Sequence, residues 1–294
     1  MPRRQPFTAL CQTAARLALP GRIDLHTHTT ASDGDFTPSQ LVVQACTAGL
    51  TAVAVTDHDT TAGLVEARAT MLPNRPLEIV SGVEISTVYN DHGYHLLGYF
   101  LNEQYGELQR GLAGIRERRR DRFRQFLDAF ERDGVSIPEH LVGAYASSEI
   151  AVGRRHLAKL LVAAGHANSL QIAFQKYILP QRIPCLHSAP MIDALGWIRA
   201  AGGVSSLAHP GSGTTSDLLS ELHALGLDAV EANCPSVGYG FGQDLAIWAA
   251  RNGLLTTGGS DYHGSAHTLG SRTVSATQFA ALRERAARSG PTPM

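Results

Sequence analysis

Short apolar segments that end in polar residues recur along the chain and give the first indication of its fold. Segments of strand length cover residues 23–28, 52–58, 79–84, 95–100, 204–209, 229–233 and 254–261. Apolar runs of this length, bounded by polar residues, are typical of strands that lie inside a protein. We interpret these segments as buried strands.

Helix-like stretches lie between several of these segments. Thr37 and Pro38 have the form of an N-cap and a first helical turn, and Gly49 suits the end of the apolar run that follows. The same alternation returns at residues 218–225, which Gly226 ends, and at residues 245–250, which end near Gly253. Repeated β/α units predict a parallel sheet, either open or closed.

The middle of the chain has a different pattern. Residues 103–132 are rich in Arg, Glu, Gln and Leu and place apolar residues at helical spacing. Two further helix-like stretches cover residues 156–164 and 170–178. We therefore predict that residues 102–187 form a helical, substrate-binding insertion.

The predicted insertion separates two halves of a barrel domain, residues 22–101 and 188–285. Residues 1–21 remain as an N-terminal tail. Gln12 and Arg16 interrupt the apolar stretch that a targeting signal needs, so we expect no export.

Charge and cysteine content narrow the class of protein further. The 25 basic and 26 acidic residues nearly cancel, so no overall field would hold duplex nucleic acid or an anionic membrane. No apolar run approaches the roughly 20 residues that span a bilayer. Cys11, Cys46, Cys185 and Cys234 lie far apart, which fits neither a zinc ribbon nor a disulfide scaffold and indicates a reducing cytoplasm. Because the overall charge is nearly zero, any phosphate must be bound by a local group of side chains or backbone amides.

The first candidate for chemistry is the pair His26 and His28. Two residues apart on a strand, both rings point to the same face, which is a geometry that suits metal ligands. A lone histidine would more often be a hydrogen-bonded core residue, but a pair at the end of a strand favours ligation. Asp24 lies deeper on the same face, where it would orient a ligand from behind.

Acidic residues follow the first two strands. Asp33 lies on the loop after the first strand, beside Gly34, although alone it would be an ordinary turn residue. The next strand ends in Asp57, His58 and Asp59, and the roles of the two aspartates stay open.

The later strands carry the same residue types. Glu84 and His95 belong to adjacent apolar segments, and Glu84 could instead face solvent. His209, Asp261 and His263 follow the last segments. Active sites of parallel β/α barrels gather at the carboxyl ends of the strands, where almost all of these residues fall. Oxygen and imidazole donors without thiolates suit manganese, magnesium, iron or zinc, and the donors are too many for one ion.

Together these segments resemble the PHP (polymerase and histidinol phosphatase) family of metal-dependent phosphoesterases. The resemblance is carried by HxH at His26 and His28, SDG at Asp33, TDHD ending at Asp59, and the later GVE, HPG and GSDxH segments. It extends over residues 23 to about 270, and the order and number of the motifs argue against chance.

The resemblance implies an α/β fold, a distorted TIM-like (β/α)7 barrel with a helical insertion. It also implies a cluster of about three divalent ions, commonly manganese, with iron or zinc as substitutes. The residues at positions that match the family's ligands are His26, His28, Asp33, His58, Glu84, His95, His209, Asp261 and His263.

Divalent ions lower the pKa of bound water and neutralise phosphate charge, so we expect a metal-activated hydroxide to attack a phosphate monoester. The chain has neither a GxSxG elbow nor a Walker-type GxxxxGK segment, and no protein nucleophile is needed. His209 or His263 could act catalytically by assisting the leaving group.

Substrate contacts are expected in the insertion. Residues 153–158 begin a helix-like stretch where Arg154 and the helix amides could bind a second phosphate, or could form an ordinary solvated helix start. The Arg-x-His-x-Ala pattern of Arg154 and His156 is similar to one that faces the metal site in nucleotide-directed PHP phosphatases. Arg182 stands near a position where relatives have Gly-Lys-Pro, and could replace that lysine.

The resemblance favours removal of the 3′-phosphate from nucleoside 3′,5′-bisphosphates such as pAp, and trimming of short 5′-phosphorylated RNA. Histidinol phosphate is a rival substrate. An amidohydrolase that cleaves C–N bonds and a noncatalytic metal-binding PHP module are the alternatives from other classes. The remaining histidines lack motif support and are assigned to surface or core: His92, His140, His166, His187, His223 and His267.

Overall fold

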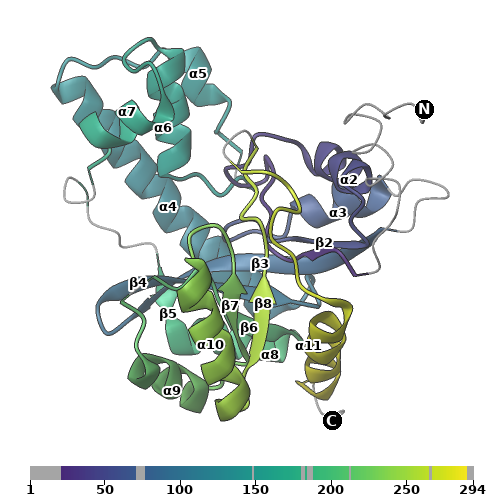
Figure 1. Cartoon of the computed structure of the whole chain (residues 1–294). Helices are drawn as coiled ribbons and strands as arrows, with labels where there is room; N and C mark the ends of the chain where they lie inside the picture. Colours follow the sequence, from purple (N-terminus) through teal and green to yellow (C-terminus); the bar gives the residue numbers. More distant parts are fainter. Residues whose placement is uncertain are drawn as a thin grey trace, which may run out of the picture.

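The computed structural model describes residues 21–70, 77–147, 149–179, 183, 188–211, 213–264 and 267–289. The predicted N-terminal tail, apart from Gly21, lies outside these ranges, and so do Arg182 and His187. The described chain has two parts, a barrel-like α/β body and a lobe of helices that stands on one side of it (Figure 1).

Eight strands form one mixed sheet in the described part of the chain. Along the main path they lie in the order β1 (Ile23–Asp24), β2 (Ala52–Val55), β3 (Glu78–Tyr89), β4 (His92–Tyr99), β6 (Val204–Leu207), β7 (Ala229–Asn233) and β8 (Leu255–Gly258). The two-residue β5 (Ala189–Pro190) pairs with β3 off this path. All of the predicted strand segments are therefore present.

The two edges of the sheet approach each other closely. The Leu25 amide, just after β1, donates to the carbonyl of Gly258 at the end of β8 over 3.2 Å. Thr27 and Tyr262 continue this contact as an isolated parallel bridge. The sheet is thus a nearly closed barrel, which confirms the predicted α/β barrel class.

Strand β4 departs from the alternating β/α pattern. It runs antiparallel to both of its neighbours, β3 and β6, whereas the other paired strands are parallel. A tight hairpin joins β3 to β4 through Asn90 and Asp91, which have φ angles of 48° and 61°. Two successive residues with positive φ are the requirement of the hairpin turn whose twist matches that of the strands. No helix intervenes here, and the chain reverses direction.

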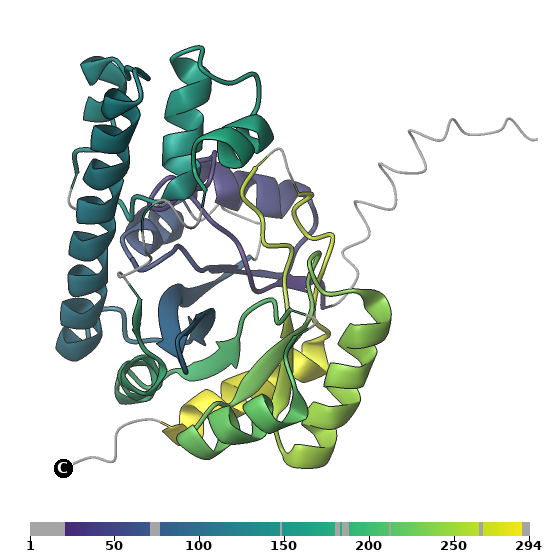
Figure 2. The same ribbon diagram turned by 90° about the vertical axis from the view of Figure 1, so that its left-hand side faces the viewer.

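The barrel is surrounded by helices, as Figure 2 shows. These are α2 (Pro38–Thr47), α3 (Gly63–Ala69), α8 (Met191–Ala200), α9 (Ser216–Leu225), α10 (Tyr239–Asn252) and α11 (Ala276–Ser289). Helix α2 starts as predicted, because Thr37 and Gln40 form a reciprocal capping box. Helices α9 and α10 end at Gly226 and Gly253, both in the left-handed conformation.

The helical lobe comprises α4 (Gly106–Arg132), α5 (Glu139–Gly143), α6 (Arg154–Ala163) and α7 (Leu170–Lys176), all between β4 and β5 in the chain. Helix α4 belongs to two hydrophobic cores. Leu112 and its neighbours pack with the barrel, whereas Phe126 and Phe130 pack with α6 and α7. Helix α4 therefore joins the lobe to the barrel along its length (Figure 2). Among the described residues, no helix is long and apolar enough to cross a bilayer.

The close packing of α4 on α8 depends on Gly111. A Cβ atom at this position would lie 2.7 Å from ring atoms of Trp197, whereas a Cβ at Gly114 would meet only the end of the Arg118 side chain, at 3.4 Å. Gly111→Ala should lower the free energy of unfolding by about 1–3 kcal/mol through overpacking. Gly114→Ala, the matched control, should raise it by up to about 1 kcal/mol because alanine favours the helix. Urea unfolding of both variants tests this, and equal stabilisation by the two alanines would contradict it.

Candidate metal centre

The structure brings all of the sequence-predicted ligands together at one end of the barrel. His26 and His28 follow β1, His58 follows β2, and His209 follows β6. Glu84 and His95 lie within β3 and β4, because both of these strands continue beyond the barrel rim as a hairpin. Asp33, Asp261 and His263 lie on the loops after β1 and β8. We assign these donor atoms to three overlapping groups, which we call subsites A, B and C. His267, which was assigned to surface or core, forms a further group of possible ligands with Asp261 and His263.

Subsite A consists of His26, His28, Glu84 and Asp261. The Nε2 atoms of His26 and His28 lie 3.3 and 3.2 Å from Oε2 of Glu84. The same two nitrogens lie 3.5 and 3.3 Å from Oδ1 of Asp261. His26, His28 and Glu84 thus form a compact group of possible ligands, and Asp261 adds an oxygen beside both histidines.

Subsite B consists of Glu84, His95 and His209. Oε1 of Glu84 lies 3.0 Å from Nδ1 of His95 and 3.0 Å from Nε2 of His209. The two ring nitrogens are 3.1 Å apart. Glu84 therefore contributes one oxygen to subsite A and the other to subsite B.

Subsite C consists of Asp33, His58 and His263. Oδ1 of Asp33 lies 3.2 Å from Nε2 of His263 and 4.0 Å from Nε2 of His58. Nδ1 of His28 is 3.9 Å from the same oxygen. His58 also turns its Nδ1 toward Oε2 of Glu84, at 3.0 Å, so it lies between subsite C and the rest of the centre.

The donor set fits divalent cations. Buried side-chain atoms without a hydrogen-bond partner gather here: Nε2 of His26, both ring nitrogens of His28, Oδ1 of Asp33, Nδ1 of His58 and Oε2 of Glu84. Each unpartnered buried polar atom costs about 1–3 kcal/mol, so a cluster of them indicates an absent partner. Two donors about 2.1 Å from a common ion lie about 3 Å apart, which is close to the separations in subsites A and B.

Protons and metal ions compete for this centre. Burial disfavours the charged form of His28, but the neighbouring carboxylates of Asp261 and Glu84 outweigh it and raise its pKa to about 10. Burial likewise opposes ionisation of Asp33 and Glu84, yet the neighbouring histidines hold both carboxyl pKa values well below the usual range. In the metal-free protein the carboxylates are thus charged and His28 carries a proton, which a bound cation must displace.

Glu231 was not expected at the site from the sequence, but the structure places it where it supports two of the ligands. It is fully buried on β7, and its Oε1 lies 3.0 Å from Nδ1 of His26. Its Oε2 accepts the backbone N–H of His209 over 2.7 Å. A carboxylate on one ring nitrogen leaves the other to face a metal, so Glu231 orients His26 toward subsite A. The available signal was a charged residue inside an apolar strand.

The aspartates whose roles were open or indirect are saturated by protein donors. Asp24 accepts from the amides of His26 and Ser260 and from the Ser260 hydroxyl, as expected of a residue behind the ligands. Asp57 accepts from Thr29 and from the Ser32 hydroxyl. Each therefore fixes a loop and leaves ligation to the neighbouring residues.

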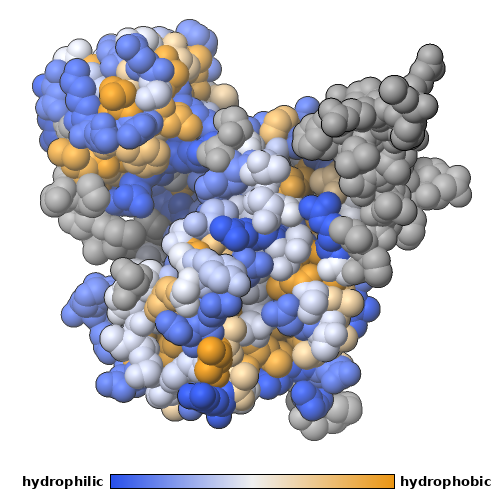
Figure 3. Space-filling view, viewed as in Figure 1, coloured by the Kyte–Doolittle hydropathy of each residue, from blue (hydrophilic) through white to orange (hydrophobic). Residues whose placement is uncertain are grey.

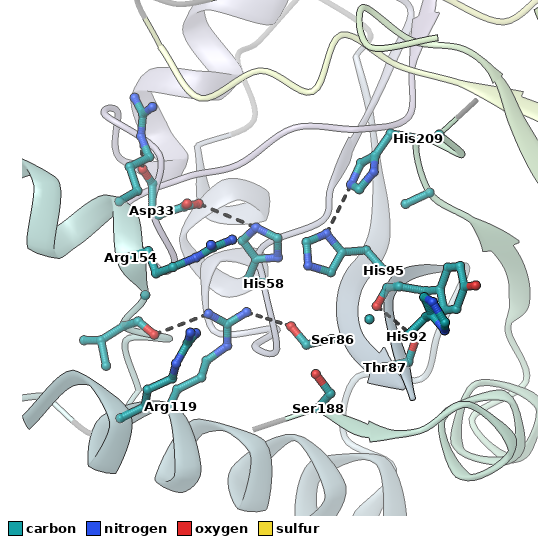
Figure 4. Close-up of a pocket in the computed structure, with 18 of the residues that line it drawn as sticks. Asp33, His58, Ser86, Thr87, His92, His95, Arg119, Arg154, Ser188 and His209 are labelled. Carbon is teal, nitrogen blue, oxygen red and sulfur yellow. Dashed lines mark hydrogen bonds and ion pairs between the residues drawn. The ribbon is translucent and has the colours of Figure 1, made fainter. Parts of the chain in front are cut away.

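A cavity of about 690 Å³ opens beside the centre, between the barrel and the helical lobe. His58, His95 and His209 line it on the barrel side, and Arg154 extends toward His58 from the lobe (Figure 4). Figure 3 shows hydrophilic residues in the recess between the two parts. Phe123 and Phe126 of α4 add an apolar wall. The cavity can therefore accept a molecule with both anionic and apolar parts.

Only one of the three predicted substrate contacts lies on the cavity wall in the described part of the chain. Arg154 is exposed and lines the cavity. The prediction for His156 is wrong in its role, because the ring is 2% exposed and both nitrogens are engaged. Its Nδ1 accepts from the Gly153 amide over 3.0 Å, and its Nε2 lies 2.8 Å from the carbonyl oxygen of Ser32. Arg182 lies outside the described residues.

Other cavity residues were not expected from the sequence. Arg119 and Arg122 line the cavity from α4, where Arg119 interrupts the apolar stripe of the helix. His92, which was assigned to surface or core, also lies on the cavity wall. The available signal in the sequence was an arginine at a position on the apolar face of the predicted helix, between Ile115 and Phe123.

Histidines and carboxylates at the rim of a nearly closed α/β barrel, beside a cavity lined with arginines, define a metal-dependent hydrolase of anionic substrates. Comparison with known proteins agrees. The PHP domain family matches residues 24–113. Over 248 residues the chain is 33% identical to the 3′,5′-nucleoside bisphosphate phosphatase of Chromobacterium violaceum, with 82% of this chain and 87% of the relative covered.

Two further similarities extend over most of the chain. It is 33% identical over 249 residues to the 5′-3′ exoribonuclease Rnm of Escherichia coli, with 82% of this chain and 84% of the relative covered. A solved structure from Bifidobacterium adolescentis, described as a proposed metal-dependent phosphoesterase, matches with a TM-score of 0.83 and 29% identity, covering 92% of this chain and 96% of the other. The chain belongs to the PHP family and is a metal-dependent phosphoesterase, as its motifs predicted.

Glu231→Gln should weaken metal binding. An amide can offer its single oxygen to His26 or to the His209 amide, but not to both, so one support is lost. We expect the affinity for Mn²⁺ to fall by about 10–100-fold, the usual effect of removing a residue that orients a ligand. Metal content at graded free Mn²⁺ measures this. Glu221→Gln is the control, because this exposed side chain of α9 bonds to the Tyr89 hydroxyl and to no ligand; equal affinity of both variants would sink the idea.

His156 should make the metal-free protein sensitive to acid. Burial lowers its pKa to about 4, against the opposing charge of Asp33, whereas an unfolded histidine titrates near pH ~6.5. The unfolded state therefore binds more protons between these values, so this contribution is complete above pH ~6.5 and is lost as the pH falls toward 4. Over this range, the free energy of unfolding should fall on the order of 3 kcal/mol further than in His156→Gln. Parallel profiles in urea unfolding would contradict this.

Proposed function

We propose that this chain removes the 3′-phosphate from nucleoside 3′,5′-bisphosphates such as pAp, and that it also trims short 5′-phosphorylated RNA. The observation that carries the proposal is the position of Arg154 across the cavity from the metal centre. A substrate with two phosphates could place one at the centre and the other at this arginine. The names of the Chromobacterium violaceum and Escherichia coli relatives support both substrate classes.

Arg154 is the best candidate for the second phosphate because of its charge balance. Arg119 and Arg155 are paired with Asp59 and Asp35, whereas Arg154 has no carboxylate within salt-bridge distance in the described part of the chain. A guanidinium without a carboxylate partner can bind two oxygens of a phosphate, and no existing ion pair has to break first. The apolar wall of Phe123 and Phe126 suits the rest of a nucleotide.

The proposed centre holds three divalent ions in subsites A, B and C, manganese in the first instance, with iron or zinc as substitutes. When bound, such ions lower the pKa of coordinated water and neutralise phosphate charge. Glu231 orients His26 and His209, and Asp24 and Asp57 hold the loops that carry the other donors. These carboxylates keep the nitrogen and oxygen donors in fixed directions.

His209 is a better candidate than His263 for assisting the leaving oxygen. Nδ1 of His263 is engaged with the Asp261 carbonyl and its Nε2 lies beside Asp33. His209 lines the cavity, and its Nε2 faces Glu84 in subsite B, which leaves its Nδ1–H to donate a hydrogen bond to the leaving oxygen. Such a hydrogen bond would stabilise the negative charge that develops on this oxygen as the ester bond breaks.

Arg154→Met should remove the preference for a second phosphate. The manganese-loaded protein should release phosphate from adenosine 3′,5′-bisphosphate with a lower KM than from adenosine 3′-monophosphate. A charge-assisted phosphate contact contributes about 1.5–3 kcal/mol, so the variant should raise the KM for the bisphosphate about 10–100-fold and leave that for the monophosphate unchanged. Lys176→Met on α7 is the control for loss of a lobe cation.

The same assay separates the competing substrates. Turnover of histidinol phosphate alone would redirect the assignment, and hydrolysis of amides without phosphate release would favour C–N chemistry. Glu84→Ala should abolish every activity, since it removes a donor from two subsites. Absence of phosphate release from each substrate, the 5′-phosphorylated RNA included, would indicate a noncatalytic module.

A further inference from the structure

Helices of the lobe contact the two loops that carry Asp33 and His58, which are residues of subsite C. We propose that the helical lobe assembles this subsite: α6 positions Asp33 and α4 positions His58, so that the ion bound there depends on the lobe. His26 and Asp261 of subsite A depend instead on carboxylates of the barrel. The inference rests on the ligand assignment of the proposed function and goes beyond it, because it gives the lobe a role in metal binding.

On the α6 side, three consecutive contacts hold the backbone around Asp33. Nε2 of His156 donates to the carbonyl of Ser32 over 2.8 Å. Nε of Arg155 and Nζ of Lys159 donate to the carbonyl of Asp33 itself, over 3.0 and 3.1 Å. With its backbone held from one side, the Asp33 side chain is directed toward His263 on the other.

An ion-pair cluster reinforces this attachment. The carboxylate of Asp35 lies 3.1 Å from Nη2 of Arg155 and 2.8 Å from Nζ of Lys159. The amide of Ala151, just before α6, also donates to the carbonyl of Ala31 over 3.1 Å. The loop of residues 31–35 is therefore attached to the lobe at several points along its length.

On the α4 side, Arg119 reaches the loop that carries His58. Its Nε lies 2.5 Å from Oδ2 of Asp59, and its Nη2 donates to the Ser86 hydroxyl over 2.7 Å. Arg116 donates to the carbonyl of Asp59 over 3.0 Å. Asp59 has a φ angle of 49°, in the left-handed region, and its side chain accepts from the Ser86 amide and from Arg119, which hold it in this conformation. Arginines of α4 thus hold the residue next to His58.

His26 and Asp261 of subsite A receive their described support from within the barrel, whereas the backbone of Glu84 is bonded to Asp59, which α4 holds. Glu231 of β7 binds the ring of His26, and Asp24 of β1 binds the backbone of His26 and of Ser260, which precedes Asp261. The subsites therefore differ in what holds them. Loss of a lobe contact should weaken the binding of the ion in subsite C and leave the binding of the other ions unchanged.

The test compares His156→Met with His156→Gln and Lys159→Met with Lys176→Met. Methionine removes the donor to Ser32, whereas glutamine keeps a donor near the position of Nε2. Lys159 is partly exposed, so its variant tests the same loop at less risk to folding. Bound Mn²⁺ per chain is measured at graded free Mn²⁺, beside thermal unfolding of each metal-free protein.

We expect His156→Met and Lys159→Met to bind one class of ion about 10–100-fold more weakly while the rest bind unchanged. His156→Gln and Lys176→Met should match the unchanged chain. Equal weakening of all ions, or a lower melting temperature without any change in stoichiometry, would show that the contacts only attach the lobe, and would overturn the proposal. If the unchanged chain itself binds no Mn²⁺, the proposed metal centre fails, and this inference fails with it.

Discussion

The rest of the site depends on the burial of one carboxylate. Glu84 is 1% exposed, and its two oxygens lie within 3.3 Å of ring nitrogens from five histidines: His26, His28, His58, His95 and His209. A buried carboxylate is tolerated only when it has counter-charges or metal ions as partners. The histidines must therefore be held around it, and Glu231, another buried carboxylate, holds two of them, His26 and His209. The hydrogen bonds behind the ligands are therefore needed to keep the histidines in contact with Glu84.

The position of Glu84 follows from the irregular part of the barrel. In an all-parallel barrel each strand would end near the rim, but β3 continues past it and turns back as β4. Glu84 lies in this extension, opposite His58 across an isolated bridge, and His95 returns on β4 to the same region. The antiparallel hairpin thus brings a carboxylate and an imidazole over the barrel mouth. The ends of parallel strands alone would place side chains only around its edge.

Much of this arrangement could be predicted from the sequence, because strand ends and motif spacing are local properties. His26 and His28 share a face by parity alone, and Thr37 and Gln40 cap their helix through residues three apart. The reversal at β4 could not be predicted, because Asn90 and Asp91 read as an ordinary polar pair until their φ angles are known. The role of His156 was also beyond local reasoning. Its partner Ser32 is 124 residues away in the chain, and the same histidine could equally have faced a substrate.

A consequence of this long-range pairing is that substrate binding and metal binding share one helix. The first turn of α6 presents Arg154 to the cavity, while Arg155 and His156 hold the loop of Asp33. Because successive residues of a helix point about 100° apart, one turn can serve both faces. A change in the lobe that moved α6 to admit a different substrate would therefore also displace Asp33. Substrate range in this chain is constrained by the geometry that subsite C requires. Substitutions at Phe123 or Phe126 in the cavity wall fall under the same constraint, because both side chains pack with α6 in one hydrophobic core.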